Sequence, residues 1–342
     1  MNENTQNNQS TKRLQFEIDP MTGRLSSQSA SRYFSRFGWF VFTMALVVQV
    51  VITAVYTVTA IAFPNVYSHF AFGDVISFVT IYGIALPVSL PLLLKLPYEK
   101  PVSAKMSVGG FWIGFCICMA LMTIGSNISS IFLNLVQNLS GSTTENPLEV
   151  AISSTPWWFN LLTTVILAPI LEELLFRRLV CNRLAPLGEG FTVFLSAAFF
   201  ALIHGNFYQL FYAFLIGAFL AFIYVKTGRL RYTIIYHMLV NFFGGFVAPL
   251  VYDLVDMEAL SSVNIAAIAA NIFPILLLLA YNVLVLGACC VGIIMMISMR
   301  HKFTLHKGLL QPPERWGGAL FLNSGIAAAI AVLAFDLVRS LG

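Results

Sequence analysis

The fold is decided by the stretch from Phe159 to Arg177, which reads FNLLTTVILAPILEELLFR. The part up to Leu171 suits the interior of a lipid bilayer, and two adjacent carboxylates, Glu172 and Glu173, follow at or just inside its edge. One carboxylate at the centre of a membrane helix costs about 2.5–3.5 kcal/mol on insertion scales, so acids at this depth are functional candidates. The stretch therefore predicts a membrane-spanning helix that ends in a pair of candidate functional acids.

Helical geometry gives the two acids different surroundings. Glu173 and Arg177 are four residues apart, so they share one face of the helix in the order that favours an ion pair. Glu172 is rotated by about 100° from Glu173, at about 3.6 residues per turn, and has no such local partner. We therefore expect another helix to supply Glu172 with a partner or with water.

The composition predicts an all-α, polytopic bundle of transmembrane helices. Of the 342 residues, 58% are apolar and only 10% are charged, whereas a soluble domain carries about 25% charged residues. The net charge of +4 is modest, and the basic residues cluster in loops, which indicates topology and no nucleic-acid partner. The five cysteines lack metal or redox spacing and are expected to be small apolar side chains in helices.

Nine apolar runs follow one another along the chain, at about residues 38–63, 75–95, 108–136, 157–176, 190–204, 207–225, 232–252, 264–299 and 316–338. The N-terminal tail and the loops after the second, fourth, sixth and eighth runs are basic, so they mark the cytoplasmic side. The eighth region is long enough to include a surface helix before Pro274. We therefore expect about 8–9 spans with a cytoplasmic N-terminus.

The domain organisation follows from these runs. Residues 1–34 are polar and rich in Asn, Gln, Ser and Arg, a composition that does not bury enough apolar surface to fold alone. The expected parts are a disordered cytoplasmic tail (1–34), N-terminal transmembrane helices (35–156), a helical core with the polar motifs (157–245) and C-terminal transmembrane helices (246–342).

Three polar motifs fall on three different predicted helices: Glu172-Glu173-x-x-x-Arg177, Phe200-x-x-x-His204 and His237-x-x-x-Asn241. The four-residue spacing places both side chains of a pair on one helical face. Imidazole and amide groups at membrane depth need partners, so one shared polar pocket around Glu172 is the least costly arrangement. His204 lies about 21 Å inside if its helix starts at Gly190; either that helix begins deeper, or the turn at Gly205 lies within the protein.

Each motif also has a purely structural interpretation. A Glu–Arg pair at a helix end is often an interfacial salt bridge, and Phe200 is a common kind of core residue. A lone histidine near a helix end is usually a satisfied interfacial residue, and Asn241 could simply join two helices. A catalytic role for these residues is favoured because ionisable groups other than Tyr and Cys are scarce within the apolar runs.

In this order and on successive helices, the three motifs resemble the CPBP family of intramembrane proteases, which includes type II CAAX prenyl endopeptidases and bacterial proteins of bacteriocin processing or self-immunity. The resemblance covers about residues 157–245. It implies that Glu172 is the catalytic glutamate that activates water and that His204 is the first catalytic histidine. It further implies that His237 and Asn241 position water and stabilise the oxyanion, while Glu173, Arg177 and Phe200 give structural support.

The resemblance implies a membrane-embedded endopeptidase that cuts a peptide or protein substrate near the cytoplasmic face, in contact with membrane lipid. A carboxylate shielded from bulk water is a useful general acid or base, and donors aimed at an oxyanion are strong in a low-dielectric pocket. Family members have been called metalloproteases, and Glu172, His204 and His237 could hold zinc. A metal-free water fits the same residues, so we favour no cofactor.

Two other functions stay open at this point. A non-catalytic immunity or scaffold protein of the same fold would keep the helices without the chemistry. A small transporter would use the acids as a proton or ion relay, although no inverted repeat is evident. The Asn-rich tail and the absence of a soluble domain favour a bacterial plasma membrane as the location.

Overall fold

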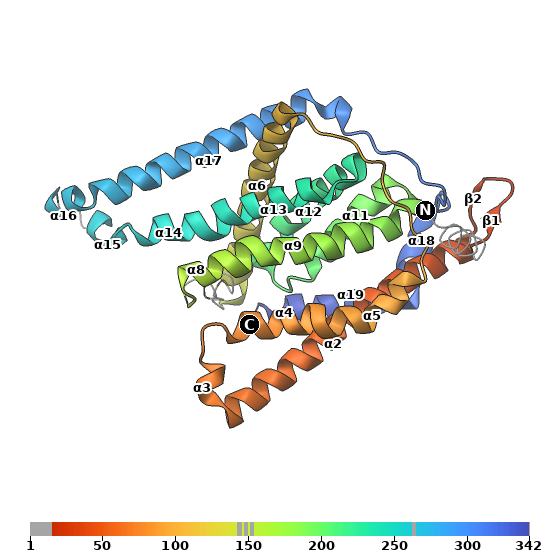
Figure 1. Cartoon of the computed structure of the whole chain (residues 1–342), viewed down its shortest axis with the longest axis horizontal. Coiled ribbons are helices and arrows are strands. Elements are labelled where there is room, and N and C mark those ends of the chain that lie inside the picture. Colours follow the sequence, from red (N-terminus) through yellow and green to blue (C-terminus); the bar gives the residue numbers. More distant parts are fainter. Residues whose placement is uncertain (1–15, 142–145, 147–149, 151–153, 262–264, 342) are drawn as a thin grey trace.

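The computed structural model describes residues 16–141, 146, 150, 154–261 and 265–341. The described chain is a bundle of long helices with one small antiparallel hairpin, in which Ile18 pairs with Leu25 (Figure 1). The all-α, polytopic prediction is confirmed.

The N-terminal half contains the hairpin and the helices up to the rod that carries the two glutamates. Its elements are β1 (Ile18–Asp19), β2 (Arg24–Leu25), α2 (Ser27–Ala62), α3 (Pro64–Tyr67), α4 (Phe72–Phe78), the π-helix η1 (Val79–Ala85), α5 (Leu86–Leu94), α6 (Val108–Ser140), α8 (Trp157–Asn160), η2 (Leu161–Leu167), α9 (Ala168–Glu173), η3 (Leu174–Cys181), α10 (Asn182–Leu184) and the 3₁₀ turn η4 (Ala185–Leu187). The segments from α8 to η4 form one continuous helical rod, and α6 stands steeply across the long axis in Figure 1.

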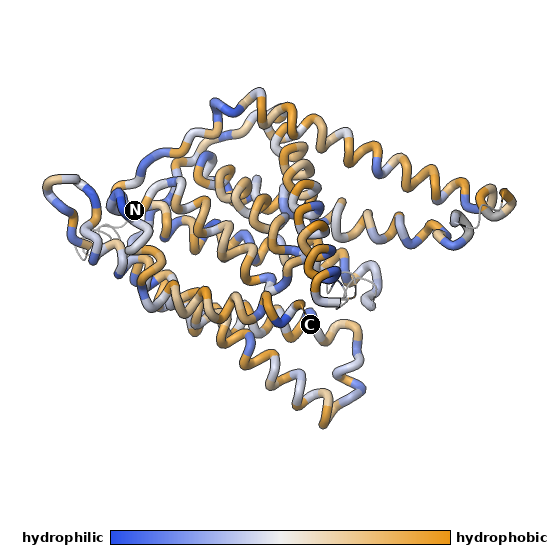
Figure 2. The backbone as a smooth tube through the Cα atoms, turned by 180° about the vertical axis from the view of Figure 1, so that it is seen from behind, coloured by the Kyte–Doolittle hydropathy of each residue, from blue (hydrophilic) through white to orange (hydrophobic). Residues whose placement is uncertain are grey.

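The C-terminal half completes the bundle. Its elements are α11 (Glu189–Leu202), α12 (Phe207–Thr227), α13 (Leu230–Asn241), the π-helix η5 (Phe242–Val247), α14 (Ala248–Asp253), α15 (Met257–Ser261), α16 (Ile265–Ala270), α17 (Ile272–Ser298), the 3₁₀ turn η6 (Arg300–Lys302), α18 (Trp316–Phe321) and α19 (Ser324–Arg339). Figure 2 shows that apolar residues dominate the long helices, while polar residues gather at the loops.

The number of spans is lower than expected. Seven helical segments are long and apolar enough to cross a membrane among the described residues, against about 8–9 predicted. The fifth run forms α11, which has 14 residues and is too short. The ninth run is broken at Asn323, whose side chain caps both neighbours: it donates to the carbonyl oxygens of Ala319 and Leu320 and accepts from the Ile326 N–H.

The expected disordered tail is wrong for residues 16–34. Phe16 and Leu25 are buried against α2, and the Glu17 N–H donates to the Ser29 hydroxyl. Ser26 caps α2, which begins at Ser27, eleven residues before the start of the first predicted run. Apolar side chains within a polar stretch found partners elsewhere in the chain, which composition does not reveal. Residues 1–15 lie outside the described residues.

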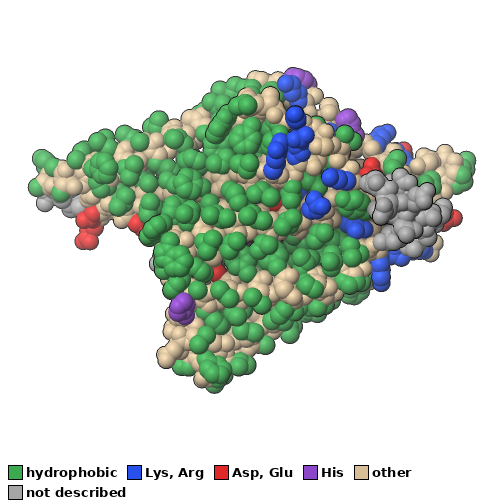
Figure 3. All heavy atoms as spheres, viewed as in Figure 1, with side chains coloured by type: hydrophobic (Ala, Val, Ile, Leu, Met, Phe, Trp, Pro, Cys, Tyr) green, Lys and Arg blue, Asp and Glu red, His purple; other side chains and the backbone are tan. Residues whose placement is uncertain are grey.

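The two ends of the bundle carry different charges. Basic side chains gather over the end that holds the C-terminus of α5 and the start of α13, and acidic ones lie near α15 at the other end (Figure 3). We call these the basic end and the acidic end. The connection from Phe303 to Arg315 crosses the basic end, where the Leu310 N–H donates to the Pro186 carbonyl and Glu189 pairs with Lys226.

Helices α2 and α19 cross at close range through two glycines. A Cβ on Gly325 would lie 2.0 Å from the Ser35 carbonyl oxygen, and one on Gly38 would lie 2.2 Å from the Gly325 carbonyl carbon. Small residues allow such close backbone contact, which is how helices associate in membranes without a hydrophobic driving force. This crossing fixes α19 beside α2.

Replacing Gly325 by Ala should therefore destabilise the protein, because the added methyl group forces α2 and α19 apart. Overpacking of this kind costs about 1–3 kcal/mol, so the thermal unfolding midpoint of the detergent-solubilised protein should fall. The matched control is Gly287→Ala in α17, where a Cβ meets nothing within 4 Å. Equal midpoints for the two variants would contradict the close crossing.

Candidate active site

Both glutamates lie on a six-residue α-helical segment between two π-helical turns. Pro169 is the second residue of this segment, α9 (Ala168–Glu173), and lacks the N–H that a regular helix would donate to an earlier carbonyl. The π-helices η2 and η3 flank α9 on either side. Such π-turns are frequent at functional sites because they re-aim the side chains that follow.

Glu173 and Arg177 form a fully buried ion pair. Arg177 Nε lies 3.0 Å from Glu173 Oε2, and both side chains are 0% exposed. Arg177 also reaches the Ser196 hydroxyl with Nη1 at 3.4 Å, and its guanidinium lies 5.2 Å from the Phe200 ring centroid. The pair is therefore enclosed by protein and does not sit at a lipid headgroup.

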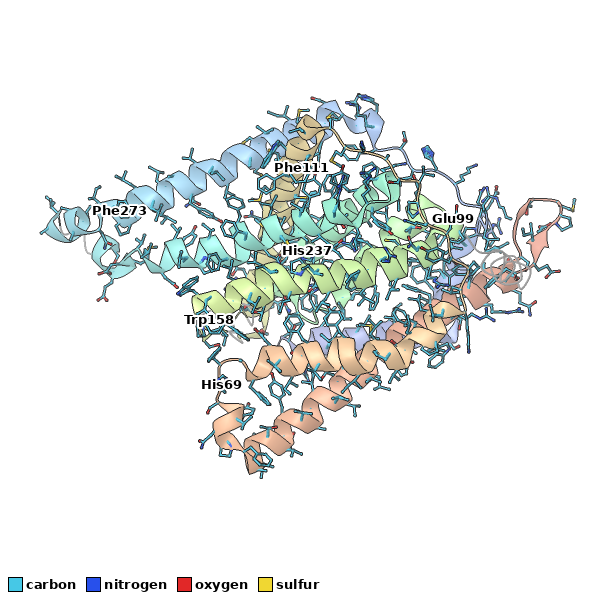
Figure 4. The ribbon with its side chains drawn as sticks, in the orientation of Figure 1. His69, Glu99, Phe111, Trp158, His237 and Phe273 are labelled. Atoms are coloured by element: carbon cyan, nitrogen blue, oxygen red, sulfur yellow. The ribbon has the colours of Figure 1, made fainter. Side chains whose placement is uncertain are left out.

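His237 lies between the two glutamates. Its Nδ1 is 3.1 Å from Glu173 Oε1, and its Nε2 is 3.7 Å from Glu172 Oε2. His237 is buried, and Figure 4 shows it in the middle of the bundle, with Trp158 toward the acidic end and Glu99 toward the basic end (Figure 4). α13 thus supplies the partner from another helix that Glu172 needs.

The contact with Glu173 fixes the chemistry of the imidazole. A carboxylate only accepts hydrogen bonds when ionised, so His237 donates through Nδ1–H. The neutral ring then presents the lone pair of Nε2 toward Glu172. Glu172 Oε2 is itself buried and has no hydrogen-bond partner among the described residues. Two atoms 3.7 Å apart are too far for a direct hydrogen bond. Part of the Glu172 side chain is exposed to the cavity, so water can approach the carboxylate from there.

His204 occupies a turn inside the protein. α11 ends at Leu202, and α12 starts at Phe207 behind the Asn206 cap, with Gly205 in the left-handed region at φ 64°. The helix of His204 does not begin deeper than expected, because α11 starts at Glu189. The turn at Gly205 therefore lies within the protein, where irregular backbone is permitted because it lines a cavity. The His204 Nδ1 lies 2.7 Å from the Phe200 carbonyl oxygen, so Nδ1–H donates there.

Phe200 separates the two histidines. Its ring centroid is 5.0 Å from that of His204 and 5.6 Å from that of His237, in edge-to-face arrangements. Phe200 is 2% exposed and also packs on Phe176 at 4.9 Å. The aromatic ring therefore sets the spacing between the imidazoles.

Asn241 lies one turn beyond His237 on the same helix. One of its two amide N–H groups donates to the Thr164 carbonyl oxygen at 2.8 Å, which joins α13 to the π-helix η2. The second N–H remains available for another acceptor. Asn241 therefore holds two helices together and can still stabilise negative charge.

One cavity of about 730 Å³ joins the candidate residues. Glu172, Phe200, His204, His237 and Asn241 all line it, whereas the lining does not include the buried pair of Glu173 and Arg177. The cavity also has many neutral polar lining residues: Ser77, Thr123, Ser126, Asn127, Ser129, Ser130, Thr163, Thr164, Tyr208, Gln209 and Tyr212. It is therefore large and polar enough to hold several waters or part of a peptide.

Comparison with known proteins gives two matches. Residues 154–243 match the family model of the Rce1-like proteins, described as type II CAAX prenyl endopeptidase Rce1-like. The chain is also 28% identical over 188 residues to the membrane-embedded CAAX protease MroQ of Staphylococcus aureus, covering 53% of this chain and 71% of the relative. The resemblance to the CPBP family is confirmed. No solved structure matches the chain.

The CPBP-family segment contains all three motifs, because residues 154–243 extend from α8 through Asn241. Its limits nearly coincide with the predicted core of residues 157–245. The family and the relative support a membrane protease in general, with a peptide or protein as the substrate. The helices α4, α6, α17 and α19 lie before and after the matched segment in the sequence.

The resemblance left Glu172, His204 and His237 open as zinc ligands. No group of three or more His, Cys, Asp or Glu residues is placed to hold a metal ion in the part of the chain that the structure describes. We derive no catalytic step through a metal.

The sequence interpretation missed several groups near the site. Asp74 of α4 and the hydroxyl and amide groups of α6 line the cavity. Asp336 of α19 accepts a hydrogen bond from Gln49 at 2.6 Å and lies beside the turn at Gly205. The sequence did contain a signal for a polar face on α6. Polar residues recur there at alternating spacings of four and three residues: Thr123, Asn127, Ser130, Asn134 and Gln137.

Arg177→Gln should strongly destabilise the protein, because the variant leaves the Glu173 carboxylate buried without its cation. Removal of one partner from a buried pair costs about 3–5 kcal/mol. The neighbouring Arg178 is exposed, so Arg178→Gln is the matched control and should change the unfolding midpoint little. If both variants unfolded at the same temperature in the same detergent, Arg177 would not be the essential counter-charge.

Proposed function

We propose that this chain is an intramembrane endopeptidase in which Glu172 activates a water molecule to attack a peptide bond. The observation that carries the proposal is the position of His237, which donates to Glu173 and turns Nε2 toward Glu172 in a cavity that His204 and Asn241 also line. A water shared by Glu172 and His237 would be both oriented and deprotonated at one place.

The proposed step balances as follows. Glu172 takes a proton from the water, whose oxygen bonds to the peptide carbonyl carbon. The second amide N–H of Asn241 donates to the resulting oxyanion, and His204 lies beside it in the same cavity. Glu172 then delivers its proton to the amide nitrogen as the C–N bond breaks, which gives a carboxylic acid and an amine. Transfer of the acid's proton to the amine leaves a carboxylate and an ammonium group, and Glu172 is ionised again.

Glu173, Arg177 and Phe200 act in this proposal without touching the substrate. Glu173 fixes the tautomer of His237, Arg177 neutralises Glu173, and Phe200 sets the distance between the histidines. This division of roles follows from exposure: Glu172 lines the cavity with 22% of its side chain exposed, whereas Glu173 is fully buried.

The proposed setting is a multi-pass protein of a bacterial plasma membrane with a cytoplasmic N-terminus. The basic end is then the cytoplasmic one, by the rule that Lys and Arg stay inside. Glu172 precedes the exposed Arg178 by six residues, or about 9 Å of helix. The reacting bond therefore lies just inside the cytoplasmic boundary.

Glu172→Gln should abolish cleavage of a peptide substrate by the purified protein, because an amide cannot accept the proton of the water. A positioned general base contributes about 10²–10⁴-fold, so the loss should be at least a hundredfold. The unfolding midpoint should stay near that of the wild type, since Glu172 carries no buried ion pair with Arg177. Full activity of Glu172→Gln would overturn the assignment.

A triple variant separates the enzyme from a non-catalytic protein of the same fold. Replacing Glu172 by Gln and both His204 and His237 by Asn should eliminate the cellular phenotype of the protein if cleavage is its function. Preservation of that phenotype by a folded triple variant would favour the immunity or scaffold role.

Removal of metal should leave the proposed activity intact. Protein dialysed against a strong chelator should cleave at the rate of the untreated protein, because Glu172 and His237 hold the water without a metal. A rate that falls on chelation and returns on addition of Zn²⁺ would assign Glu172, His204 and His237 as ligands instead.

A further inference from the structure

The cavity extends in only one direction from the candidate catalytic residues. Along the rod of α8 to η4, the lining residues run from Thr163 to Glu172, and none follows Glu172 toward the basic end. Along α13 to α14 the lining begins at His237 and continues to Ala248, toward the acidic end. Glu172 and His237 therefore form the closed end of the cavity.

On the wall formed by α4 and η1, the lining residues also lie toward the acidic end. On α4 and η1 the lining runs from Asp74 to Tyr82, the half of that span next to α3 and the acidic end. That half lies against the start of α8, because Phe70 packs on Phe159 at 5.2 Å. The buried Glu173–Arg177 pair lies on the opposite, basic side of Glu172.

One wall is a polar stripe on α6, outside the segment that matches the family. The stripe consists of Thr123, Ser126, Asn127, Ser129 and Ser130, which all line the cavity in the middle of a membrane-spanning helix. Ser129 is 3% exposed, and its hydroxyl has no hydrogen-bond partner among the described residues. A buried hydroxyl without a partner costs free energy unless water or a ligand satisfies it.

Three residues of the stripe use a donor on their own helix and keep oxygen acceptors for a ligand. Thr123 donates its hydroxyl proton to Met119 O at 2.9 Å, Asn127 donates to Thr123 O at 2.7 Å, and Ser130 donates to Ser126 O at 3.0 Å. Thr123 and Ser130 therefore use their hydroxyl protons on their own helix and keep oxygen lone pairs for a ligand, and Asn127 keeps its carbonyl oxygen together with one N–H. The hydroxyl of Ser129 can still donate as well as accept. The cavity also has the carboxylate of Asp74, and no Lys or Arg is among its described lining residues.

We infer that the substrate enters this cavity from the acidic end, as an extended, donor-rich peptide segment whose N–H groups or basic side chains lie along the α6 stripe. This inference rests on the proposed function for its substrate, but the path itself is a property of the fold. A segment that enters this way reaches Glu172 at the closed end of the cavity. The peptide bond can then be cleaved near the basic end although the cavity has no entrance on that side. Asp74 and the acceptor oxygens favour cationic over anionic segments.

Thiol labelling tests the path without any need for catalysis. Ser126→Cys and Ser130→Cys are near-isosteric and place a thiol in the stripe, while Ile131→Cys is the control. Ile131 is the next residue on α6, is 70% exposed and does not line the cavity, so lipid should cover it. Wild-type protein gives the background from its five native thiols.

Two exposed positions report the side of the membrane. Ser68→Cys marks the acidic end and Lys100→Cys marks the basic end, since both residues are exposed beyond the ends of long helices. A membrane-impermeant cationic methanethiosulfonate is applied to intact cells or to inverted vesicles. The stripe thiols should react from the same side as Ser68→Cys, at least tenfold faster than Ile131→Cys and faster than with an anionic reagent of similar size.

Two results would overturn the inference: reaction of the stripe thiols from the Lys100 side, or a rate no higher than that of Ile131→Cys. Because neither depends on cleavage, failure of the proposed enzyme and failure of the path are distinguishable. A protein without peptidase activity whose stripe is labelled from the Ser68 side keeps the path and loses only the proposed chemistry.

Peptide kinetics test the role of the stripe in binding. Asn127→Leu should raise KM by about tenfold or less with little change in kcat, as expected for loss of one hydrogen bond. The control is Asn282→Leu on α17, because Asn282 is likewise exposed and donates to its own helix at Leu278 O, 2.8 Å away. Equal KM values for the two variants would remove Asn127 from substrate binding.

Discussion

The buried ion pair between Glu173 and Arg177 is the constraint on which the site depends. Neither charge is exposed, so desolvation offsets much of the attraction between them. His237 and Ser196 add one contact each from α13 and α11, while Glu173 Oε2 and Arg177 Nη2 have no hydrogen-bond partner among the described residues. The pair therefore ties three helices together at one level of the bundle. Because Glu173 also fixes the proton of His237 on Nδ1, one electrostatic requirement sets both the packing and the orientation of the imidazole beside Glu172.

Three further features of the fold form the cavity beside that ion pair. The α11–α12 hairpin turns within the protein at Gly205, which brings His204 to the cavity and leaves the turn facing polar groups. Phe200 fills the space between the imidazoles. On the other side, α6 carries hydroxyl and amide groups through the middle of a membrane span. A closed basic end and a polar-lined cavity toward the acidic end result from these three features together.

Particular residues show how far the sequence could be interpreted. The different surroundings of Glu172 and Glu173 follow from a helical rotation of about 100°, and the structure has one in the cavity and the other fully buried. The count of spans was too high because a 14-residue run looks like a short span, although α11 turns back within the protein. The tail was expected to be disordered because its composition is polar, yet Phe16 packs on Tyr33 at 5.0 Å. Local composition does not report contacts with distant segments.

The sequence by itself determined that the chain is a helical membrane protein and which few polar side chains interrupt its apolar runs. Periodicity and hydropathy are local properties, so they are readable without coordinates. Only the tertiary structure decided that His237 stands between the two glutamates, that His204 sits on an internal turn and that the cavity closes on the basic side. Those facts depend on which helices pack together and at what depth each begins, and close backbone contacts such as that of Gly325 with Ser35 fix both.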